Sequence, residues 1–590
     1  MPFLLAQLVA PPTQQGPIRL PGPVPIQEPA GPDKPSPRLE LPTPAPTRQP
    51  TGTQAEPGGQ GLRTSPTSVA LPFPIEGITP YSNADLVRIL GNCPSAEACS
   101  RLLRQQLLKD GYINTQVVPT RNQEGLRVLS GRLERITVDG PSSWLNRRVK
   151  RLLGDLVQQP LRLPVLEQQL RLLQLQPGVK TVNGRLTSIN DDPQRAQLLL
   201  TVTPARQPLR GDFSIRNDGS NSSGQFRATG VLLQNSLALP GDSLLLYSEL
   251  DSTDAPQIGA FIGSVSYTVP LGDTLGLTAS YGYNNNTPFE YNRIIPSGYF
   301  GPFPYVSPLT QLTTNQYQGQ LQLEWAFQES LLQRWSLTAA LVSNENRLTY
   351  NADPCLSYTQ IGGWPGGSLC KLSFYDFYGA SLLNPKTGFV RLGLNANGLS
   401  GRVSWFGTAY LLQGIGSMTP DDQLRGLAAI GIDPAAATAF GGLASANWQL
   451  SPRWQLNLRL GGQIAINPLT SPMQFTLGSD VGIRGLPGQL VSGDSGWLSS
   501  GEAVWTVWQK KNQALQLIPF IGAGGVYTNN RFTSLNDIVG SGGLLARWLA
   551  GDHFSLELGY AHTFATDNNQ GPWNNWLLGS GLYTKASYRF

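Results

Sequence analysis

The last ten residues of the chain alternate between side chains suited to lipid and side chains suited to water. Side chains of a β-strand point to opposite faces with a period of two, and a strand needs roughly 9 to 11 residues to cross a bilayer. The apolar face ends on two aromatic residues, so we predict an outer-membrane β-barrel with Tyr588 and Phe590 as its C-terminal signal. The lipid face would hold Leu582, Thr584, Ala586, Tyr588 and Phe590, and the water face Tyr583, Lys585, Ser587 and Arg589.

The same alternation recurs upstream, in residues 317–327, 454–460 and 554–560. A soluble β-sandwich also alternates. Here, however, the polar faces are rich in Gln, Arg, Glu and Ser, and aromatic residues stand at strand ends, as in the interfacial girdles of membrane barrels. A helical membrane protein is excluded, because the chain has no stretch of about 18 uninterrupted apolar residues.

Residues 209–590 are the part that we assign to the barrel. The chain has 65 Gly and 48 Pro, and only 14% of its residues are charged, so turn formers are plentiful. At roughly two dozen residues per strand and connection, this length predicts about sixteen strands, and bacterial barrels have an even number. Polar stretches too rich in Gly and Pro for membrane strands indicate long surface loops at residues 284–315, 351–372 and 417–441, and an inserted loop at 478–496.

Two segments precede the folded part of the chain. Residues 1–10 resemble the tail of a secretion signal without its basic n-region, so we expect a signal peptide that is only partly present. Residues 11–70 form a proline-rich linker, with sixteen prolines between residues 11 and 66. Such segments are extended and have few aliphatic side chains to offset the entropy of ordering. We predict a disordered tether; a ligand for another protein's aromatic groove is the alternative.

Residues 71–208 are predicted to be an α+β region in two copies, 71–131 and 132–208. Each copy would be a small sheet with two helices on one face and at least one open edge, which can accept an extended partner by β-augmentation. The helices are expected at 82–90, 97–110, 144–157 and 164–173, and the strands at 112–119, 126–129, 133–138, 179–186 and 197–203.

Positive charge is concentrated in this α+β region. Residues 71–208 carry 18 Lys and Arg against 11 Asp and Glu, whereas residues 209–590 carry 20 against 23. An acidic client, anionic lipid headgroups and plain solvation remain open as interpretations. We predict no nucleic-acid partner, because no aromatic interleaving or recognition motif accompanies the charge. The client-binding candidates are a cluster on one predicted helix, Arg147, Arg148, Lys150 and Arg151.

Short motifs carry a family resemblance. The inserted loop contains IRGL followed by SGDSG at 492–496, and a later strand contains FIGAG. With SGRLERITVDG at 130–140 and QPGVKTVNGRL at 176–186, these motifs in this order resemble the two-partner secretion transporters of the TpsB family (ShlB/FhaC/HecB-like), within the BamA superfamily. The motif residues are Ile483, Arg484, Gly485 and Leu486 in the loop, and Phe520, Gly522 and Gly524 in the strand, where the family has F-x-D-x-G.

The resemblance implies a fold and a function. The fold would be mainly β, a transmembrane β-barrel of about 16 antiparallel strands preceded by two periplasmic α+β POTRA domains, POTRA 1 at residues 71–131 and POTRA 2 at 132–208. The protein would bind an unfolded exoprotein at these domains and secrete it through the barrel, with folding of the client outside the cell as a driving force. The expected partners are a TpsA-like exoprotein of the filamentous hemagglutinin or hemolysin type, outer-membrane lipid and the barrel assembly machinery. We expect a monomer without a cofactor or metal.

The resemblance also raises the question of what holds Arg484, which the family loop carries into the lumen and pairs with the Asp of F-x-D-x-G. In this chain that position is Gly522. A buried charge left without its partner is unfavourable by on the order of 3 to 5 kcal/mol. We therefore expect another lumen carboxylate, with Glu502 as the first candidate and Asp494 as the second; the alternative is a loop held less firmly.

The four cysteines form two local sets, Cys93 with Cys99 and Cys355 with Cys370. Local disulfides are expected for both sets in an exported protein. Closing a loop of about 15 residues would contribute around 3 kcal/mol in the chain-entropy model. Metal binding is the weaker interpretation, because the chain has only two histidines and neither is near these cysteines in sequence.

The sequence does not favour an enzyme. GDSG at 493–496 overlaps the serine-protease signature, but His553 lies in a predicted turn and His562 continues a lipid-alternating strand. No GxxxxGK[ST] phosphate loop is present either. A general insertase of the BamA type and a passive porin remain as alternative functions, although a porin would not need a pair of POTRA domains.

Overall fold

The computed structural model divides into two compact units, residues 27–206 and residues 207–590 together with 1–26, and each is described by itself. Within these units the structure describes residues 38–40, 71–91, 93–174, 179–190, 192–204, 209–219, 224–239, 241–252, 258–272, 274–286, 294–295, 305–306, 312–350, 355–358, 367–370, 385–429, 431–488, 490–529, 534–565 and 581–590.

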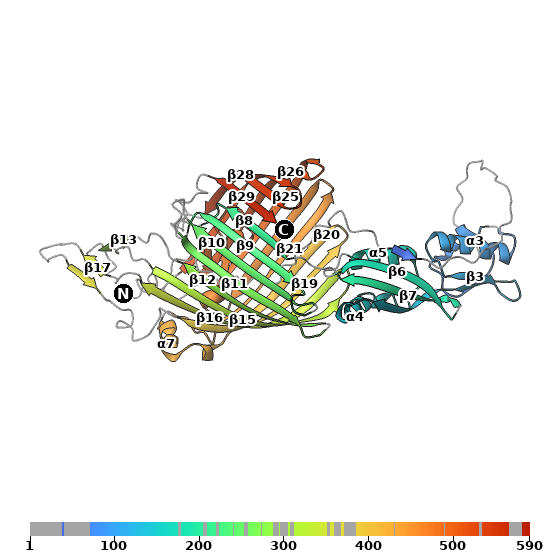
Figure 1. Ribbon diagram of the computed structural model, residues 1–590, viewed down its shortest axis with the longest axis horizontal. Coiled ribbons are helices and arrows are strands. Elements are labelled where there is room, and N and C mark those ends of the chain that lie inside the picture. The colour runs from blue at the N-terminus through green and yellow to red at the C-terminus, as the bar shows by residue number, and fades with distance from the viewer. Residues whose placement is uncertain are drawn as a thin grey trace. The chain divides into compact units, whose positions relative to one another are not determined.

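Sixteen strands of the larger unit close into an antiparallel barrel, which confirms the predicted fold class and strand number (Figure 1). Each strand pairs with its neighbour along the chain, and the last strand, β29, pairs with the first, β8. The strands are β8 (Arg210–Arg216), β9 (Phe226–Asn235), β10 (Ser243–Ser252), β11 (Ile258–Pro270), β12 (Leu275–Asn286), β15 (Leu312–Glu329), β16 (Gln333–Tyr350), β19 (Lys386–Ser400), β20 (Val403–Gly414), β21 (Thr438–Ser451), β22 (Trp454–Ala465), β25 (Ser495–Lys510), β26 (Gln513–Asn529), β27 (Ser534–Ala550), β28 (Phe554–Ala565) and β29 (Leu582–Arg589).

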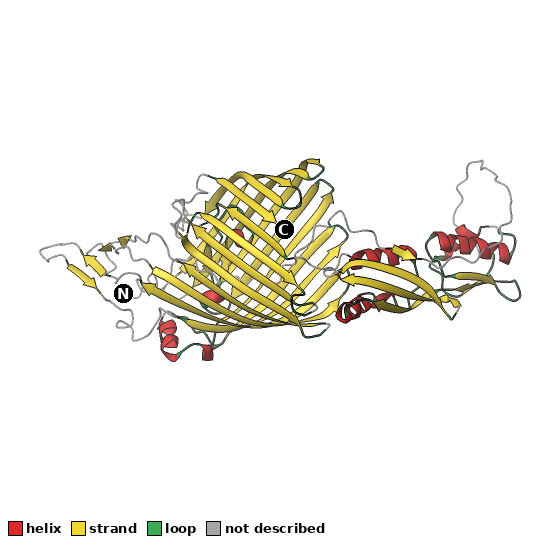
Figure 2. Cartoon of the chain, in the orientation of Figure 1, coloured by secondary structure: helices red, strands yellow, loops and turns green. Residues whose placement is uncertain are grey.

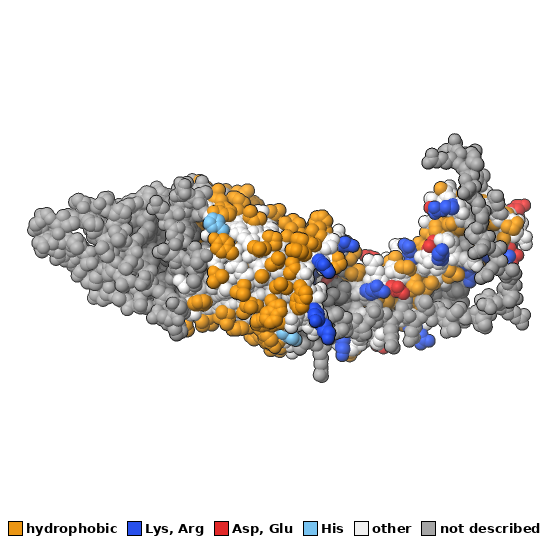
Figure 3. All heavy atoms as spheres, turned by 90° about the horizontal axis from the view of Figure 1, so that it is seen from above, with side chains coloured by type: hydrophobic (Ala, Val, Ile, Leu, Met, Phe, Trp, Pro, Cys, Tyr) orange, Lys and Arg blue, Asp and Glu red, His pale blue; other side chains and the backbone are white. Residues whose placement is uncertain are grey.

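The outer face of the barrel is apolar, as the alternation in the sequence predicts. On β29, Leu582 and Tyr588 are 56% and 49% exposed, whereas Tyr583 and Ser587 are buried on the inner side. Figure 3 shows hydrophobic side chains spread over the barrel surface. Removing such a surface from water is favourable only in contact with lipid, so the strands are suited to a membrane.

The C-terminal strand closes the barrel through backbone pairing. Residues Lys585 to Arg589 of β29 lie opposite Arg216 to Asp212 of β8. Beyond β29, the N–H of Phe590 donates to the carbonyl of Gly211 at 3.1 Å, and the N–H of Gly211 donates back at 3.0 Å. The aromatic end predicted as a barrel signal therefore lies on the first strand.

The connections contain short elements of their own. The predicted surface loop at 417–441 is partly helical, because η2 (Gly416–Met418) and α7 (Asp421–Ala429) lie in it before β21 begins. Both ends of the predicted loop at 284–315 are barrel strand instead, because β12 continues to Asn286 and β15 begins at Leu312. Most of the remainder of this loop and of the loop at 351–372 lies outside the described residues, apart from β13 (Ile294–Ile295), β14 (Tyr305–Val306), β17 (Cys355–Tyr358) and β18 (Gly367–Cys370). Among the described helices, none has the length and apolar character of a membrane span.

In the smaller unit the order strand, helix, helix, strand, strand occurs two times in succession (Figure 2). In the first copy, Ser82 and Ser95 cap the two helices, because each hydroxyl accepts a bond from the backbone N–H three residues on, at 3.2 Å. Leu103 and Leu107 pack fully buried against Leu126 of the sheet. The elements are β2 (Ile75–Glu76), α2 (Asn83–Leu90), α3 (Ala96–Lys109), β3 (Gln116–Pro119) and β4 (Leu126–Leu129).

In the second copy the predicted helix at 144–157 is shorter than expected. It ends at Leu152, and Gly154 begins a 3-10 turn, since glycine is unfavourable inside a helix. Leu145 and Val149 of the helix are buried. The elements are β5 (Arg132–Asp139), α4 (Ser143–Leu152), η1 (Gly154–Leu156), α5 (Leu163–Gln174), β6 (Val179–Ile189) and β7 (Asp192–Pro204).

Three residues within the proline-rich segment form a strand, and its other residues up to 70 lie outside the described part of the chain. β1 (Arg38–Glu40) runs parallel to β6, with Arg38 opposite Asn183 and Glu40 opposite Arg185. The strand completes a sheet in the order β1-β6-β7-β5. A sheet edge offers unpaired backbone groups to any extended segment, so a short strand can form here even in a segment with few aliphatic residues.

Candidate functional site

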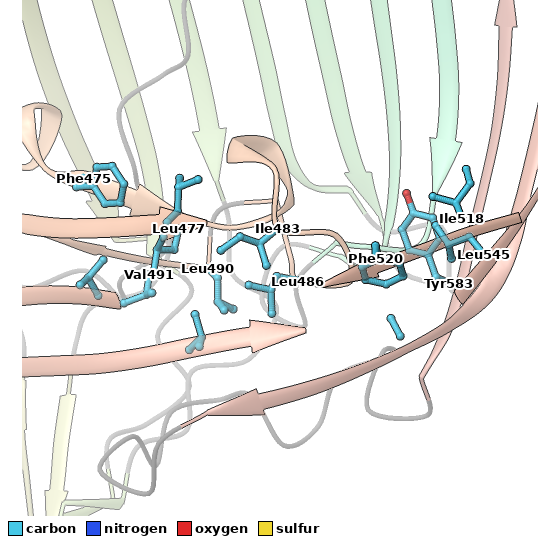
Figure 4. Packing of buried hydrophobic residues seen from close by; sticks show 14 of the residues in the cluster. Phe475, Leu477, Ile483, Leu486, Leu490, Val491, Ile518, Phe520, Leu545 and Tyr583 are labelled. Carbon is cyan, nitrogen blue, oxygen red and sulfur yellow. The ribbon is translucent and has the colours of Figure 1, made fainter. Parts of the chain in front are cut away.

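The inserted loop, residues 478–496, lies against the inner wall of the barrel between β22 and β25. It contains η4 (Ser479–Val481) and β24 (Val491–Gly493), and β24 pairs with β23 (Phe475–Leu477), which follows the short η3 (Ser471–Met473). Figure 4 shows its apolar side chains beside those of the wall. This packing fixes the loop inside the barrel; the buried cluster includes Phe475, Leu477, Ile483, Leu486, Leu490 and Val491 with Ile518, Phe520, Leu545 and Tyr583.

Arg484 is bound by two carboxylates of the wall. Its Nε donates to Glu502 Oε1 at 2.5 Å, and its Nη2 lies 3.3 Å from the other oxygen of Glu502 on β25. Its Nη1 donates to Glu557 Oε2 on β28 at 2.8 Å. Because a guanidinium presents donors in a planar fork, one arginine joins two strands that are not neighbours in the barrel.

The charges around Arg484 form a chain. Arg547 of β27 donates through Nε to the second oxygen of Glu557 at 2.8 Å, so two arginines share this carboxylate. Burial lowers the pKa of Arg484, but the attraction of Glu502 and Glu557 outweighs it and holds the pKa above the usual value. Arg484 therefore stays a cation at physiological pH, and its docking depends on the two carboxylates.

The backbone of the loop requires glycine beside Arg484. Gly485 has φ of +79°, in the left-handed region, and a Cβ at this position would lie 2.7 Å from Ala561 Cβ of β28. Close approach also allows the Ser541 hydroxyl on β27 to donate to the Arg484 carbonyl. The glycine of IRGL thus lets the loop lie directly on the wall.

Gly522 stands where the family motif F-x-D-x-G has Asp, and the loop packs closely against this position. A Cβ at Gly522 would lie 3.2 Å from Ile483 Cγ2 and 3.1 Å from Ser500 Cβ, so this position faces Ile483 of the loop. Gly524 makes similar room, because a Cβ there would lie 2.6 Å from Leu477 Cδ2. The carboxylate for Arg484 comes instead from Glu502, which lies opposite Phe520 in the register of β25 and β26.

Asp494, the second candidate, lies away from Arg484. It accepts bonds from the Leu469 N–H and the Gln474 side chain, both at 3.1 Å. Its own N–H donates to Thr528 Oγ1 at 3.0 Å. Burial raises the pKa of Asp494, and these bonds oppose the shift without cancelling it. Asp494 therefore fastens the end of the loop to the preceding segment and is not a partner of Arg484.

The cysteines and the basic cluster are not part of this charged site. Cys93 and Cys99 form a disulfide with Cα atoms 5.6 Å apart. Cys355 and Cys370 lie opposite each other in the register of β17 and β18. On α4, Arg147 and Lys150 are exposed, and Arg148 lies over the ring of Trp144 at 5.6 Å; the fourth residue of the cluster, Arg151, is partly buried.

Glu557 is the site residue that the sequence analysis missed. The alternation of β28 puts it on the water side, but nothing in the sequence brings it to the loop, because that depends on the register of four consecutive strands. Among the described residues, no group of three His, Cys, Asp or Glu side chains is arranged to bind a metal ion. The arrangement holds a loop through ionic contacts, which can be broken and remade without any covalent step.

Comparisons with known proteins agree with this geometry. Residues 383–544 match the model of a family described as haemolysin secretion/activation protein ShlB/FhaC/HecB. CdiB from Escherichia coli is similar with 14% identity over 98% of this chain and 94% of that chain, at a TM-score of 0.54. CdiB from Acinetobacter baumannii is similar with 18% identity over 90% and 91%, at a TM-score of 0.50. No protein of curated function matches the chain in sequence.

At these identities the two solved structures show the fold alone. The family match covers the inserted loop and the strands that carry Glu502 and Phe520. Together they confirm the predicted resemblance to TpsB transporters of the BamA superfamily. They support an outer-membrane β-barrel for protein transport, and the family implies a secreted TpsA-type exoprotein as the partner.

Proposed function

We propose that this chain, a member of the ShlB/FhaC/HecB family, secretes one dedicated unfolded exoprotein through its barrel by two-partner secretion. The client is recognised in the periplasm by the α+β unit, whose two copies, residues 71–131 and 132–208, act as POTRA domains. Export needs no nucleotide, because a client that buries its apolar surface outside the cell does not return.

The α+β unit has surfaces suited to an extended client. Its sheets end in β2 and β3 in the first copy and in β5 in the second. Edge strands offer backbone donors and acceptors to a chain that is not yet folded. The excess of Lys and Arg in residues 71–208 would favour clients with acidic segments, with Arg147 and Lys150 as exposed contacts.

The observation that carries the proposal is the inserted loop, held in the lumen by Arg484 between Glu502 and Glu557. The loop lies against the inner wall of the barrel and is attached there by ion pairs. A loop attached by ion pairs can move aside and return, because each pair can exchange its partners for water or for a passing polypeptide. This supports a gated path over a permanently open one.

Quantitative proteomics of a strain that lacks this gene tests the proposal. The secreted fraction and the outer membrane are compared with those of the parent and of a complemented strain. We expect the loss of one large secreted or surface protein, with other barrel proteins unchanged. Depletion of many barrels would point to a general insertase, and no change in either fraction would point to a passive porin.

A further inference from the structure

The inserted loop has a second ionic attachment, four residues before Arg484. Asp480, in η4, accepts a bond from Arg216 Nη2 of β8 at 3.3 Å and from Arg227 Nη2 of β9 at 3.1 Å. The neighbouring Ser479 hydroxyl donates to Asp218 Oδ2 at 2.8 Å. The loop therefore contacts the first two strands of the barrel as well as β25 and β28.

The site that receives Asp480 is buried. Arg227 is only 2% exposed and also donates to Glu249 Oε2 of β10 at 2.7 Å. Asp218 Oδ1 and Asp251 Oδ1 lie 3.6 Å and 3.7 Å from its other nitrogens. A charge held in this way depends strongly on each partner, because the remaining charges stay desolvated when one is removed.

The receiving residues belong to a row of charges that crosses six adjacent strands. Each member lies directly opposite the next in the strand register, and the order of strands is β27, β28, β29, β8, β9 and β10. The loop places a charge of opposite sign next to each part of the row. Asp480 pairs with Arg216 and Arg227, and Arg484 pairs with Glu557. We call this set the charged row: Arg547, Glu557, Lys585, Arg216, Arg227 and Asp251.

The charged row crosses the barrel at its shortest strand pairing, between β29 and β8. This pairing has five residue pairs, fewer than any other between neighbouring described barrel strands. One of the five sets Lys585 opposite Arg216, and the next pair in the row sets Arg216 opposite Arg227. Like charges directly opposite each other destabilise strand pairing, so the closure needs nearby anions.

We propose that Asp480 is a positioning residue for transport, the second anchor of the inserted loop. Asp480 binds β8 and β9, and Arg484 binds β25 and β28. Through these two residues the loop links strands on both sides of the β29–β8 closure. Asp480 offsets the repulsion between Arg216 and Arg227, and in turn these two arginines hold the loop inside the lumen. The inference deepens the proposed function, on which its role in transport rests; the anchor itself is a property of the barrel.

The charge of Asp480 can be removed with little change of shape by Asp480→Asn, and retained by Asp480→Glu. The purified full chain is tested in planar bilayers for conductance, and on gels for the temperature at which the folded barrel converts to the unfolded form. We expect Asp480→Asn to raise conductance several-fold and to lower that temperature, and Asp480→Glu to remain near the parent. The matched control is Asp421→Asn, an exposed aspartate of α7.

Three results would overturn the proposal that Asp480 anchors the loop. The first is conductance of Asp480→Asn equal to that of Asp421→Asn and the parent. The second is Asp480→Glu behaving like Asp480→Asn, since charge would then not be the cause. The third, relevant if Asp480→Asn fails to accumulate in the membrane, is failure of Asp480→Glu to accumulate as well.

The proposed link across the closure is tested with a disulfide between β8 and β29. Ser214 of β8 and Ser587 of β29 are register partners on the buried inner face, so a cysteine pair there has the spacing of a cross-strand disulfide. Oxidising Ser214→Cys/Ser587→Cys in the Asp480→Asn background should restore the parental unfolding temperature on gels, and reduction should lower it again. An unfolding temperature that stays low after oxidation would contradict the proposed link. These readouts use no client, so they stand even if secretion proteomics rejects the proposed function.

Discussion

At the scale of single residues, Arg484 has a carboxylate partner although the position that carries Asp in the family is Gly522 in this chain. A side chain at position 522 would be in tight contact with Ile483 of the loop and with Ser500, whereas Gly522 is not. Glu502, on the neighbouring strand and opposite Phe520, supplies the charge. Glu502 was the first candidate from the sequence as another lumen carboxylate, whereas Glu557 required the register of the four strands from β25 to β28.

Replacing Glu502 by Gln should loosen the loop while keeping the shape of the side chain. Arg484 would keep Glu557, so we expect a loss of about 1.5–3 kcal/mol, the range for a hydrogen bond to a charged group. The measurements are heat stability of the folded barrel and channel conductance. The control is Glu324→Gln, which breaks a lumen ion pair with Arg334 away from the loop. Unchanged stability and conductance in Glu502→Gln would contradict the docking role.

Gly485→Ala should displace the loop by a different route. The left-handed backbone alone disfavours alanine by roughly 1–2 kcal/mol, and the new methyl would meet Ala561 at 2.7 Å. We expect higher conductance and greater protease sensitivity between β22 and β25. Gly407→Ala on β20 is the matched control, because a Cβ there meets nothing within 4 Å. Equal behaviour of the two variants would argue against close docking.

At the scale of elements, hydrophobic periodicity predicted most helices and strands of the α+β unit, with ends shifted by a few residues. It failed at Gly154, where helix propensity ends α4 early, and at β1, where the partner edge and not the local sequence creates the strand. Spacing in the sequence suggested Cys93 with Cys99, and in the structure Cys93, in the connection between α2 and α3, forms a disulfide with Cys99 of α3.

Replacing Cys93 and Cys99 together by Ser should weaken the first copy locally. The disulfide closes a loop with a sequence separation of 6, for which the chain-entropy model gives about 2 kcal/mol. Amide hydrogen exchange of the intact protein should show faster exchange in α2 and α3 and no change in α4 and α5. Unchanged protection in α2 and α3 would mean that the packing of Leu103 and Leu107 suffices.

At the scale of the whole molecule, barrel length and strand alternation were sufficient to predict about sixteen strands. They could not predict how the inserted loop lies in the lumen, since its contacts with β25, β27 and β28 depend on the register of four consecutive strands. Its contacts with β8 and β9 also require the first strand to meet the last. The same closure creates the charged row. The features closest to function are thus those that depend on closing the barrel.

The most direct test of the account is secretion by a strain that carries only Arg484→Gln. The protein that disappears from the medium of the deletion strain is measured there, with the amount of folded barrel in the outer membrane measured in parallel. If the docked loop is part of the transport path, secretion falls strongly while the barrel is present at parental level. Secretion at the parental level from Arg484→Gln would show that the docked loop is not part of the transport path.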